Sequence, residues 1–191
     1  NKLDRLMLGR PDARFGIVTV GKSYLDVRQA LDELGIGDAE AEALGLAIYK
    51  VGMVWPLETE GATAFAAGKR EILVIEEKRN LIEQQLKEAL FNAPADRRPV
   101  VVGKTDERGQ PLLKTDGELT PFEIASAIVA RFGLDSFSSR TKERFEALKR
   151  RAGRPQPARA LVEEIKTVSE LSNKTPDPMD VALGAAVRIR R

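Results

Sequence analysis

The segment Gly16–Ser23, GIVTVGKS, fits the pattern G-x-x-x-x-G-K-[ST] of loops that bind nucleotide phosphates. In such a loop the four middle residues surround the phosphates with their backbone N–H groups, and a strand precedes the first glycine. Here the middle residues Ile-Val-Thr-Val are themselves the best strand candidate, and Arg10–Arg14 before them is poor strand material. We therefore favour a strand that ends in a tight turn, and keep a P-loop-like nucleotide-binding protein using Gly16–Ser23 as an alternative.

Charged residues follow the other expected strands. Glu76 and Glu77 end the apolar run Ile72–Ile75, and because neighbours on a strand point to opposite sides, they do not form a paired-carboxylate acid–base site. We expect one of them to pair with Lys78 or Arg79 and the other to be solvated or to face a partner. Lys22 is expected in the turn before a helix, either solvated or paired with a neighbouring domain.

Composition restricts the chemistry further. The 191 residues include no cysteine and no histidine, which removes disulfides, cluster ligation, the common zinc sites and the usual general base. We assign no catalytic, cofactor-binding or metal-binding residue to the chain. It is expected to be non-catalytic on its own, although whether it belongs to an enzyme is left open at this stage.

The net charge of +2 conceals a basic segment near the end of the chain. Residues 140–159 carry eight basic and two acidic residues, a net charge of +6, whereas residues 1–139 carry a net charge of −4. A basic segment can bind nucleic acid, so an adaptor acting through 140–159 is a further alternative. We do not favour it, because no aromatic residues alternate with the basic ones to stack on bases.

Strand and helix patterns alternate through the first two thirds of the chain. Unbroken apolar runs indicate strands covered on both faces, as in parallel sheets. Strands are predicted at 15–21, 46–54, 72–75 and 100–103, and helices at 23–34, 38–45, 58–67, 79–90 and 121–132. Such alternation predicts a three-layer, doubly wound α/β fold with a mostly parallel sheet of four to five strands.

Three parts are expected along the chain. Residues 1–14 are predicted to be a lead-in with one helical turn, residues 15–134 the α/β domain, and residues 135–191 a helical arm with linkers toward a following domain. Ser23 is expected to cap the first long helix, and Thr120 with Glu123 to form a capping box. The first residue, Asn1, suggests a segment of a longer polypeptide.

Several segments taken together resemble a known family. KVGMVWPLE at 50–58 and EILVIEEKRNLIEQQLKEAL at 71–90 are similar to the transketolase C-terminal-like domain of thiamine-dependent 2-oxoacid:ferredoxin oxidoreductases. VTVGKSYLDVRQALDELGI, VVVGKTDERGQPLL and GELTPFEIASAI bring the resemblance closer to the large single-chain bacterial indolepyruvate ferredoxin oxidoreductase. The resemblance covers residues 1–135 well. The rest of the chain is similar only in its general character, as a connection toward a following domain.

The resemblance implies a non-catalytic structural and assembly domain of an enzyme that converts aryl pyruvates to acyl-CoA and reduces ferredoxin. The parent would use thiamine diphosphate, Mg²⁺, iron–sulfur clusters and coenzyme A, none of them bound by this chain, which lacks a GDG…NN segment and cysteines. It implies one antiparallel edge strand, a homodimeric parent, a cytoplasmic location and no membrane contact. The expected contacts with other domains are Lys22, Trp55, Glu76 and Arg79.

Overall fold

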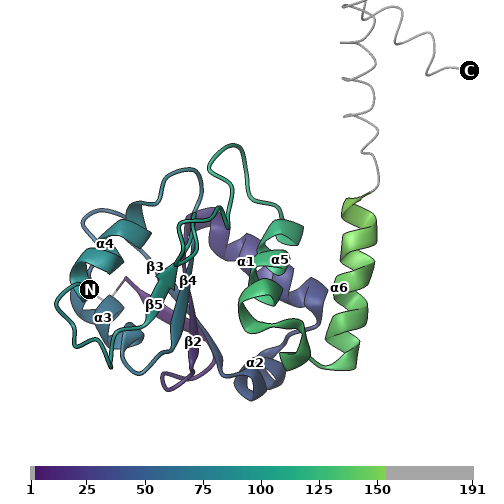
Figure 1. Cartoon of the computed structure of the whole chain (residues 1–191), viewed down its shortest axis with the longest axis horizontal. Coiled ribbons are helices and arrows are strands. Elements are labelled where there is room, and N and C mark those ends of the chain that lie inside the picture. Colours follow the sequence, from purple (N-terminus) through teal and green to yellow (C-terminus); the bar gives the residue numbers. More distant parts are fainter. Residues whose placement is uncertain (1–2, 154–191) are drawn as a thin grey trace, which may run out of the picture. The chain divides into compact units, whose positions relative to one another are not determined.

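The computed structural model describes residues 3–153. Within them five strands form one sheet in the order β1-β3-β2-β4-β5 (Figure 1). The strands are β1 (Arg5–Leu8), β2 (Phe15–Val20), β3 (Leu46–Val51), β4 (Glu71–Ile75) and β5 (Val100–Val102). β2 to β5 are parallel, whereas β1 pairs antiparallel with β3 at one edge. The mostly parallel sheet with one antiparallel edge strand is thus confirmed.

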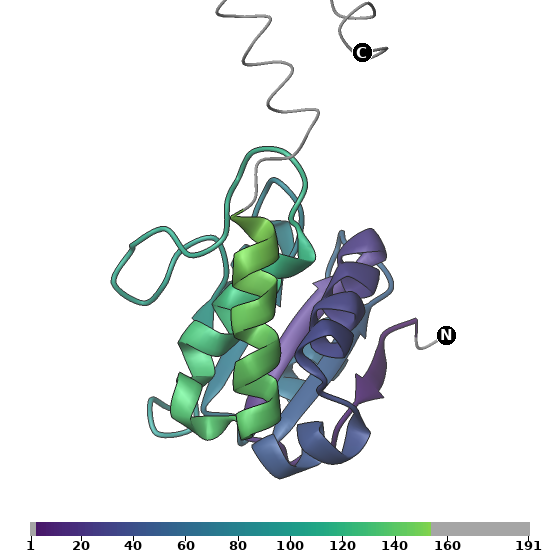
Figure 2. The same ribbon diagram turned by 90° about the vertical axis from the view of Figure 1, so that its right-hand side faces the viewer.

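Helices cover both faces of this sheet. α3 (Thr59–Ala66) and α4 (Leu81–Leu90) lie on one side, and α1 (Gly21–Leu34) and α5 (Pro121–Phe132) lie on the other (Figure 1). α2 (Asp38–Leu44) packs into the same core as α1 and α5, and α6 (Ser139–Ala152) runs alongside α5 (Figure 2). The predicted three-layer α/β architecture is therefore the one observed.

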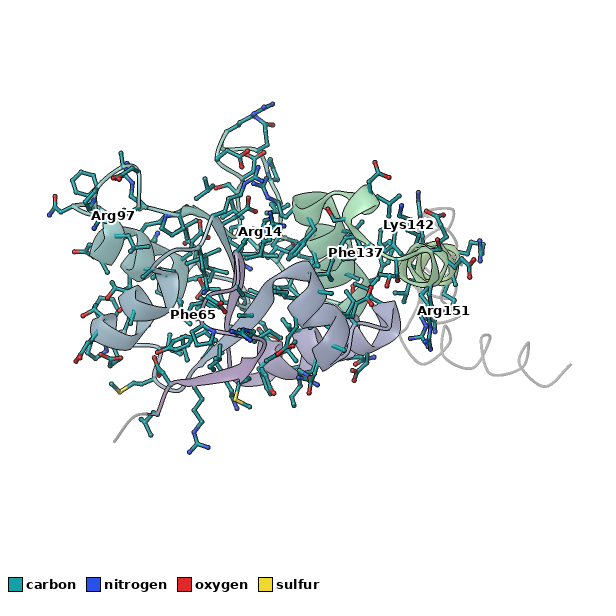
Figure 3. All side chains as sticks on the ribbon, turned by 90° about the horizontal axis from the view of Figure 1, so that it is seen from below. Arg14, Phe65, Arg97, Phe137, Lys142 and Arg151 are labelled. Carbon is teal, nitrogen blue, oxygen red and sulfur yellow. The ribbon has the colours of Figure 1, made fainter. Side chains whose placement is uncertain are left out.

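The apolar runs of the sequence fill two cores, one on each face of the sheet. All five residues of β4 are buried, and alternate residues of the strand face opposite cores. Phe65 belongs to the core beneath α3 and α4, and Phe137 to the core beneath α1, α5 and α6 (Figure 3). This double coverage explains why the strands show unbroken apolar runs instead of alternation.

Helix ends test the local predictions. The capping box of α5 is confirmed, because Thr120 Oγ1 accepts from Glu123 N and the Glu123 carboxylate accepts from Thr120 N. The expected cap at Ser23 was wrong: α1 begins at Gly21, no side chain caps it, and Ser23 is buried within its first turn. Gly21 has a φ of 53°, and this left-handed backbone lets the chain turn directly from β2 into α1.

The compact unit extends beyond the expected range 15–134 at both ends and comprises Asn1–Lys149. The helical turn expected in the lead-in was wrong, because Arg5–Leu8 forms β1 on the open edge of β3. At the other end, Thr141 and Leu148 of α6 are buried and Phe145 packs against the α1–α5 core. The thin apolar stripe of this helix therefore finds a packing surface in the domain. The predicted linkers and helix within 154–191 lie outside the described residues.

Candidate functional site at the carboxyl ends of the strands

A doubly wound sheet has one place where ligands are expected. The chain passes from β2 to β3 on one side of it, and then from β3 to β4 on the other side of β2. The direction in which strands are added therefore reverses between β2 and β4. In such sheets the crevice beyond the carboxyl ends of the two diverging strands is the usual binding site, next to helix N-termini. Here that place is bordered by the starts of α1 and α4, after β2 and β4.

The phosphate-loop pattern does not form a loop at this place. Ile17–Val20 lie within β2 and pair in parallel register with β3, while Ile17–Thr19 also pair with β4. Backbone N–H groups used in a sheet cannot surround a phosphate. The glycine that ends the pattern, Gly21, is explained by its positive φ at the strand–helix turn. The condition for the P-loop alternative is therefore not met.

Lys22 is half exposed and lies near three carboxylates of its own domain. Its Nζ lies 3.0 Å from Asp26 Oδ2, 3.5 Å from Glu77 Oε1 and 3.5 Å from Glu118 Oε2. The hydrogen bond to Asp26 is the main cause that raises the pKa of Lys22. The contact with Asp26 can be predicted from the sequence, because the two residues are four apart in one helix. Glu118 lies in a loop far along the chain, and no sequence pattern predicts its contact with Lys22.

Glu76 occupies the N-terminus of α4. Its two carboxylate oxygens accept hydrogen bonds from Ile82 N at 2.9 Å and Glu83 N at 3.0 Å. The residue is 4% exposed, and burial raises its pKa while the two amides oppose the rise. The helix end that could hold a ligand anion thus already holds a carboxylate of the chain.

Lys104 is buried beside Glu76. Its Nζ donates to the carbonyl oxygens of Glu76 at 2.6 Å and Lys114 at 3.0 Å, and burial lowers its pKa. Its backbone N donates to Glu83 Oε2 at 3.0 Å, and Glu83 Oε1 also binds Lys87 Nζ at 2.5 Å. Glu83 and Lys87 stand four residues apart in one helix, but the sequence gives no sign that Glu83 is only 1% exposed.

Two of the expected contact residues remain exposed. Trp55 is 70% exposed in the loop after β3, and Arg79 is exposed in the turn before α4. The loop is held in place by Gln85 of α4, whose Oε1 accepts from Leu57 N at 2.8 Å and whose Nε2 donates to Val54 O at 2.9 Å. Trp55 is thus a large apolar side chain presented to solvent from a fixed backbone.

The charged side chains at this end of the sheet mostly contact one another within residues 3–153. Lys22 stands among the carboxylates around it, and no three acidic side chains in the described part are placed to hold a metal ion. The expected pairing of Glu76 or Glu77 with Lys78 or Arg79 was wrong within the described residues. The Glu76 carboxylate accepts from two amides of α4 instead, and Glu77 Oε1 lies 3.5 Å from Lys22 Nζ. No helix in the same part is long and apolar enough to cross a membrane.

Comparison with known proteins places this domain in a family. Residues 5–154 match the family described as the indolepyruvate oxidoreductase domain, and the chain belongs to that family. It is 28% identical over 128 residues to indolepyruvate oxidoreductase subunit IorA of Thermococcus kodakarensis and 26% identical over 128 residues to IorA of Pyrococcus abyssi. The match covers 67% of this chain but only 18% and 17% of those proteins. The chain thus spans about a fifth of the length of these relatives.

Among solved structures, 2-oxoglutarate:ferredoxin oxidoreductase from Magnetococcus marinus aligns with a TM-score of 0.43 and 20% identity, over 69% of this chain and 20% of that one. An inactive β4 tetramer of a split-gene transketolase aligns with a TM-score of 0.42 and 20% identity, over 64% of this chain and 39% of that one.

Proposed function

We propose that the chain is a non-catalytic structural and assembly domain of an indolepyruvate, or aryl pyruvate, ferredoxin oxidoreductase acting in the cytoplasm. The observation that carries the proposal is the carboxylate of Glu76 at the N-terminus of α4. In a doubly wound sheet this helix end borders the usual ligand crevice. A carboxylate held there by two amides excludes a cofactor phosphate by charge and by occupancy. The domain is therefore built to pack against other parts of an enzyme.

The chemistry of the parent reaction belongs to other domains in this proposal. Thiamine diphosphate, Mg²⁺, iron–sulfur clusters and coenzyme A would serve the oxidative decarboxylation of a 2-oxoacid and the reduction of ferredoxin. Iron–sulfur clusters need cysteine thiolates, and the chain has no cysteine. The carboxylates around Lys22 repel the diphosphate of a cofactor. We therefore derive no reaction step through residues of this chain.

Trp55 supplies the contact with neighbouring domains in this proposal. Tryptophan is enriched at binding hot spots because it buries a large apolar area with little loss of side-chain freedom. Its loop is fixed by Gln85, so docking costs little backbone ordering. Arg79 lies just before the start of α4 and is also exposed, so it is a second candidate contact. Lys22 and Glu76 serve mainly within the domain.

Calorimetry on the purified chain tests the non-catalytic part of the proposal. The chain is titrated with thiamine diphosphate–Mg²⁺, with coenzyme A and with ATP–Mg²⁺. No heat of binding is expected from any of them. Binding of ATP that is lost in Lys22→Ala would restore a nucleotide-binding function. Binding of coenzyme A alone would keep the family but give the domain a part in handling the substrate.

Variants of the full-length parent enzyme test the assembly part. Trp55→Ala is expected to weaken assembly, measured by sedimentation velocity, and to lower activity in proportion. Phe91→Ala is the matched control, because Phe91 is 72% exposed but lies at the end of α4 away from the carboxyl ends of the strands. Equal assembly of Trp55→Ala and the parent would contradict the role of Trp55.

A further inference from the structure

Among the described residues, the outer edge of β1 is an unpaired strand edge with an apolar border. β1 is the last strand of the sheet on its side and pairs only with β3 among the described strands. Leu3, Leu6 and Met7 are exposed along it. A Cβ on Gly52 would collide with Leu3, so Leu3 lies directly against the chain that leads to Met53 and Trp55. The apolar border therefore continues from β1 to the exposed tryptophan.

Positive charge accumulates at the same edge. Arg5 of β1 stands opposite Lys50 of β3, and like charges in this position destabilise a strand pair. Lys50 Nζ lies 4.8 Å from the Tyr24 ring centroid, and Arg28 follows on the same side of α1, one turn beyond Tyr24. Within residues 3–153 these three cations form no salt bridge with a carboxylate.

The carboxylate next to Arg5 in the chain is already engaged. Asp4 accepts hydrogen bonds from Gly52 N at 2.8 Å and from the Tyr49 hydroxyl at 3.3 Å. This anchors β1 to β3 but leaves Arg5 and Lys50 uncompensated. An anionic partner at this edge would remove the repulsion between them, so the uncompensated pair favours an acidic occupant.

We propose that the β1 edge, together with Arg5, Arg28 and Lys50, binds an extended acidic polypeptide segment as an added strand. An open edge offers backbone donors and acceptors to a polypeptide, and side-chain charge selects among polypeptides. A second copy of the chain would bring its own Arg5 and Lys50 against this edge, which charge repulsion opposes. Nucleic acid would satisfy the charges but not the strand edge. The inference deepens the assembly role proposed above, rests on it, and names the chemistry of the partner.

The test uses the whole chain and a labelled peptide of about eight residues that alternates valine and glutamate, a usual strand length. Binding is followed by fluorescence anisotropy. Arg5→Glu combined with Lys50→Glu is expected to weaken binding about tenfold or more, because both attractions become repulsions. The control is Arg97→Glu combined with Arg140→Glu, which changes the net charge equally at exposed positions away from β1. This control should bind as tightly as the parent.

Two altered probes separate strand addition from simple charge attraction. A peptide alternating valine and lysine should not bind, and the valine–glutamate peptide methylated at its backbone nitrogens should bind at least about tenfold more weakly. Equal binding of the methylated peptide, or equal binding to Arg5→Glu/Lys50→Glu, overturns the proposal. So does a chain that dimerises through β1 in sedimentation, or a single-stranded oligonucleotide that binds the edge in place of the peptide. If the peptide fails while Trp55→Ala still disrupts the parent enzyme, the edge proposal falls and the assembly function stands.

Discussion

Two regions of the sheet handle their charges in opposite ways. At the start of the inner strand β4, Arg131 of α5 binds Glu71 through Nε at 2.5 Å and Nη2 at 2.8 Å, and also lies 3.0 Å from Glu107. These hydrogen bonds and charges raise the pKa of Arg131. At the β1 edge, Arg5 and Lys50 face each other without a carboxylate. Charges at the start of β4 therefore stabilise the fold, whereas those at the β1 edge are the ones that we propose a partner uses.

The two helices that begin beyond the carboxyl ends of β2 and β4 also differ in how charge is balanced at their N-termini. α4 begins with two amides bound by the buried Glu76 carboxylate. α1 begins without a side-chain cap and has Lys22 in its first turn, which the helix dipole disfavours. Glu77 and Glu118 offset this by binding Lys22. Side chains of the domain thus interact with one another at the starts of both helices.

The largest effect is expected at the start of β4. Glu71→Ala leaves the mostly buried Arg131 with only the partly exposed Glu107, and should lower the free energy of unfolding by about 3 kcal/mol. Urea denaturation measures it, with Glu71→Gln as the variant that keeps a hydrogen-bond acceptor. A loss below about 1 kcal/mol would place this pair among ordinary surface ion pairs and remove the contrast with the β1 edge.

A smaller loss is expected where β1 is anchored. Asp4→Ala removes the acceptor for Gly52 N and the Tyr49 hydroxyl, and should cost about 1–2 kcal/mol. Amide hydrogen exchange should quicken in β1 and remain unchanged in β5. Asp135→Ala, at a fully exposed carboxylate, is the control and should change neither. Unchanged exchange in β1 would show that Asp4 does not hold the strand.

The same anchor predicts a dependence on high pH. Burial, with Asp4 nearby, raises the pKa of Tyr49 above its ordinary value of 10.0. The folded chain therefore keeps this proton longer than the unfolded chain. The stabilisation is complete below about pH 10 and is lost as the pH rises toward the folded pKa. Urea titrations between pH 9 and 11 should show a steeper loss for the parent than for Tyr49→Phe, and parallel curves would contradict the raised pKa.

The smallest effect is expected from Arg5. Arg5→Ala removes an exposed cation that faces another cation, so stability should stay within about 0.5 kcal/mol of the parent or rise slightly. Thermal and urea unfolding measure it. A loss above about 1 kcal/mol would mean that Arg5 stabilises the fold, as Arg131 does beside Glu71.

Much of the fold follows from local patterns. The run Ile72–Ile75 indicates a strand covered on both faces, and Thr120 with Glu123 marks the start of α5, because such signals depend only on residues close in sequence. β1 was missed because Arg5–Leu8 is short and becomes a strand only against the open edge of β3. The part of α6 within the compact unit was likewise assigned to an arm. Its two apolar residues, Phe145 and Leu148, indicate a packed helix only once the core that they contact is known.

The sequence by itself determined the class of protein and much of what its chemistry excludes. Without cysteine or histidine the chain lacks the usual ligands for clusters and zinc, and its order of motifs indicated the family that residues 5–154 match. Only the tertiary structure decided how Lys22, Glu76 and Arg5 are used. Their partners Glu118, Glu83 and Lys50 lie at sequence distances from 7 to 96 residues. Contacts of charged groups depend on distance in space, and the folding of the chain sets that distance.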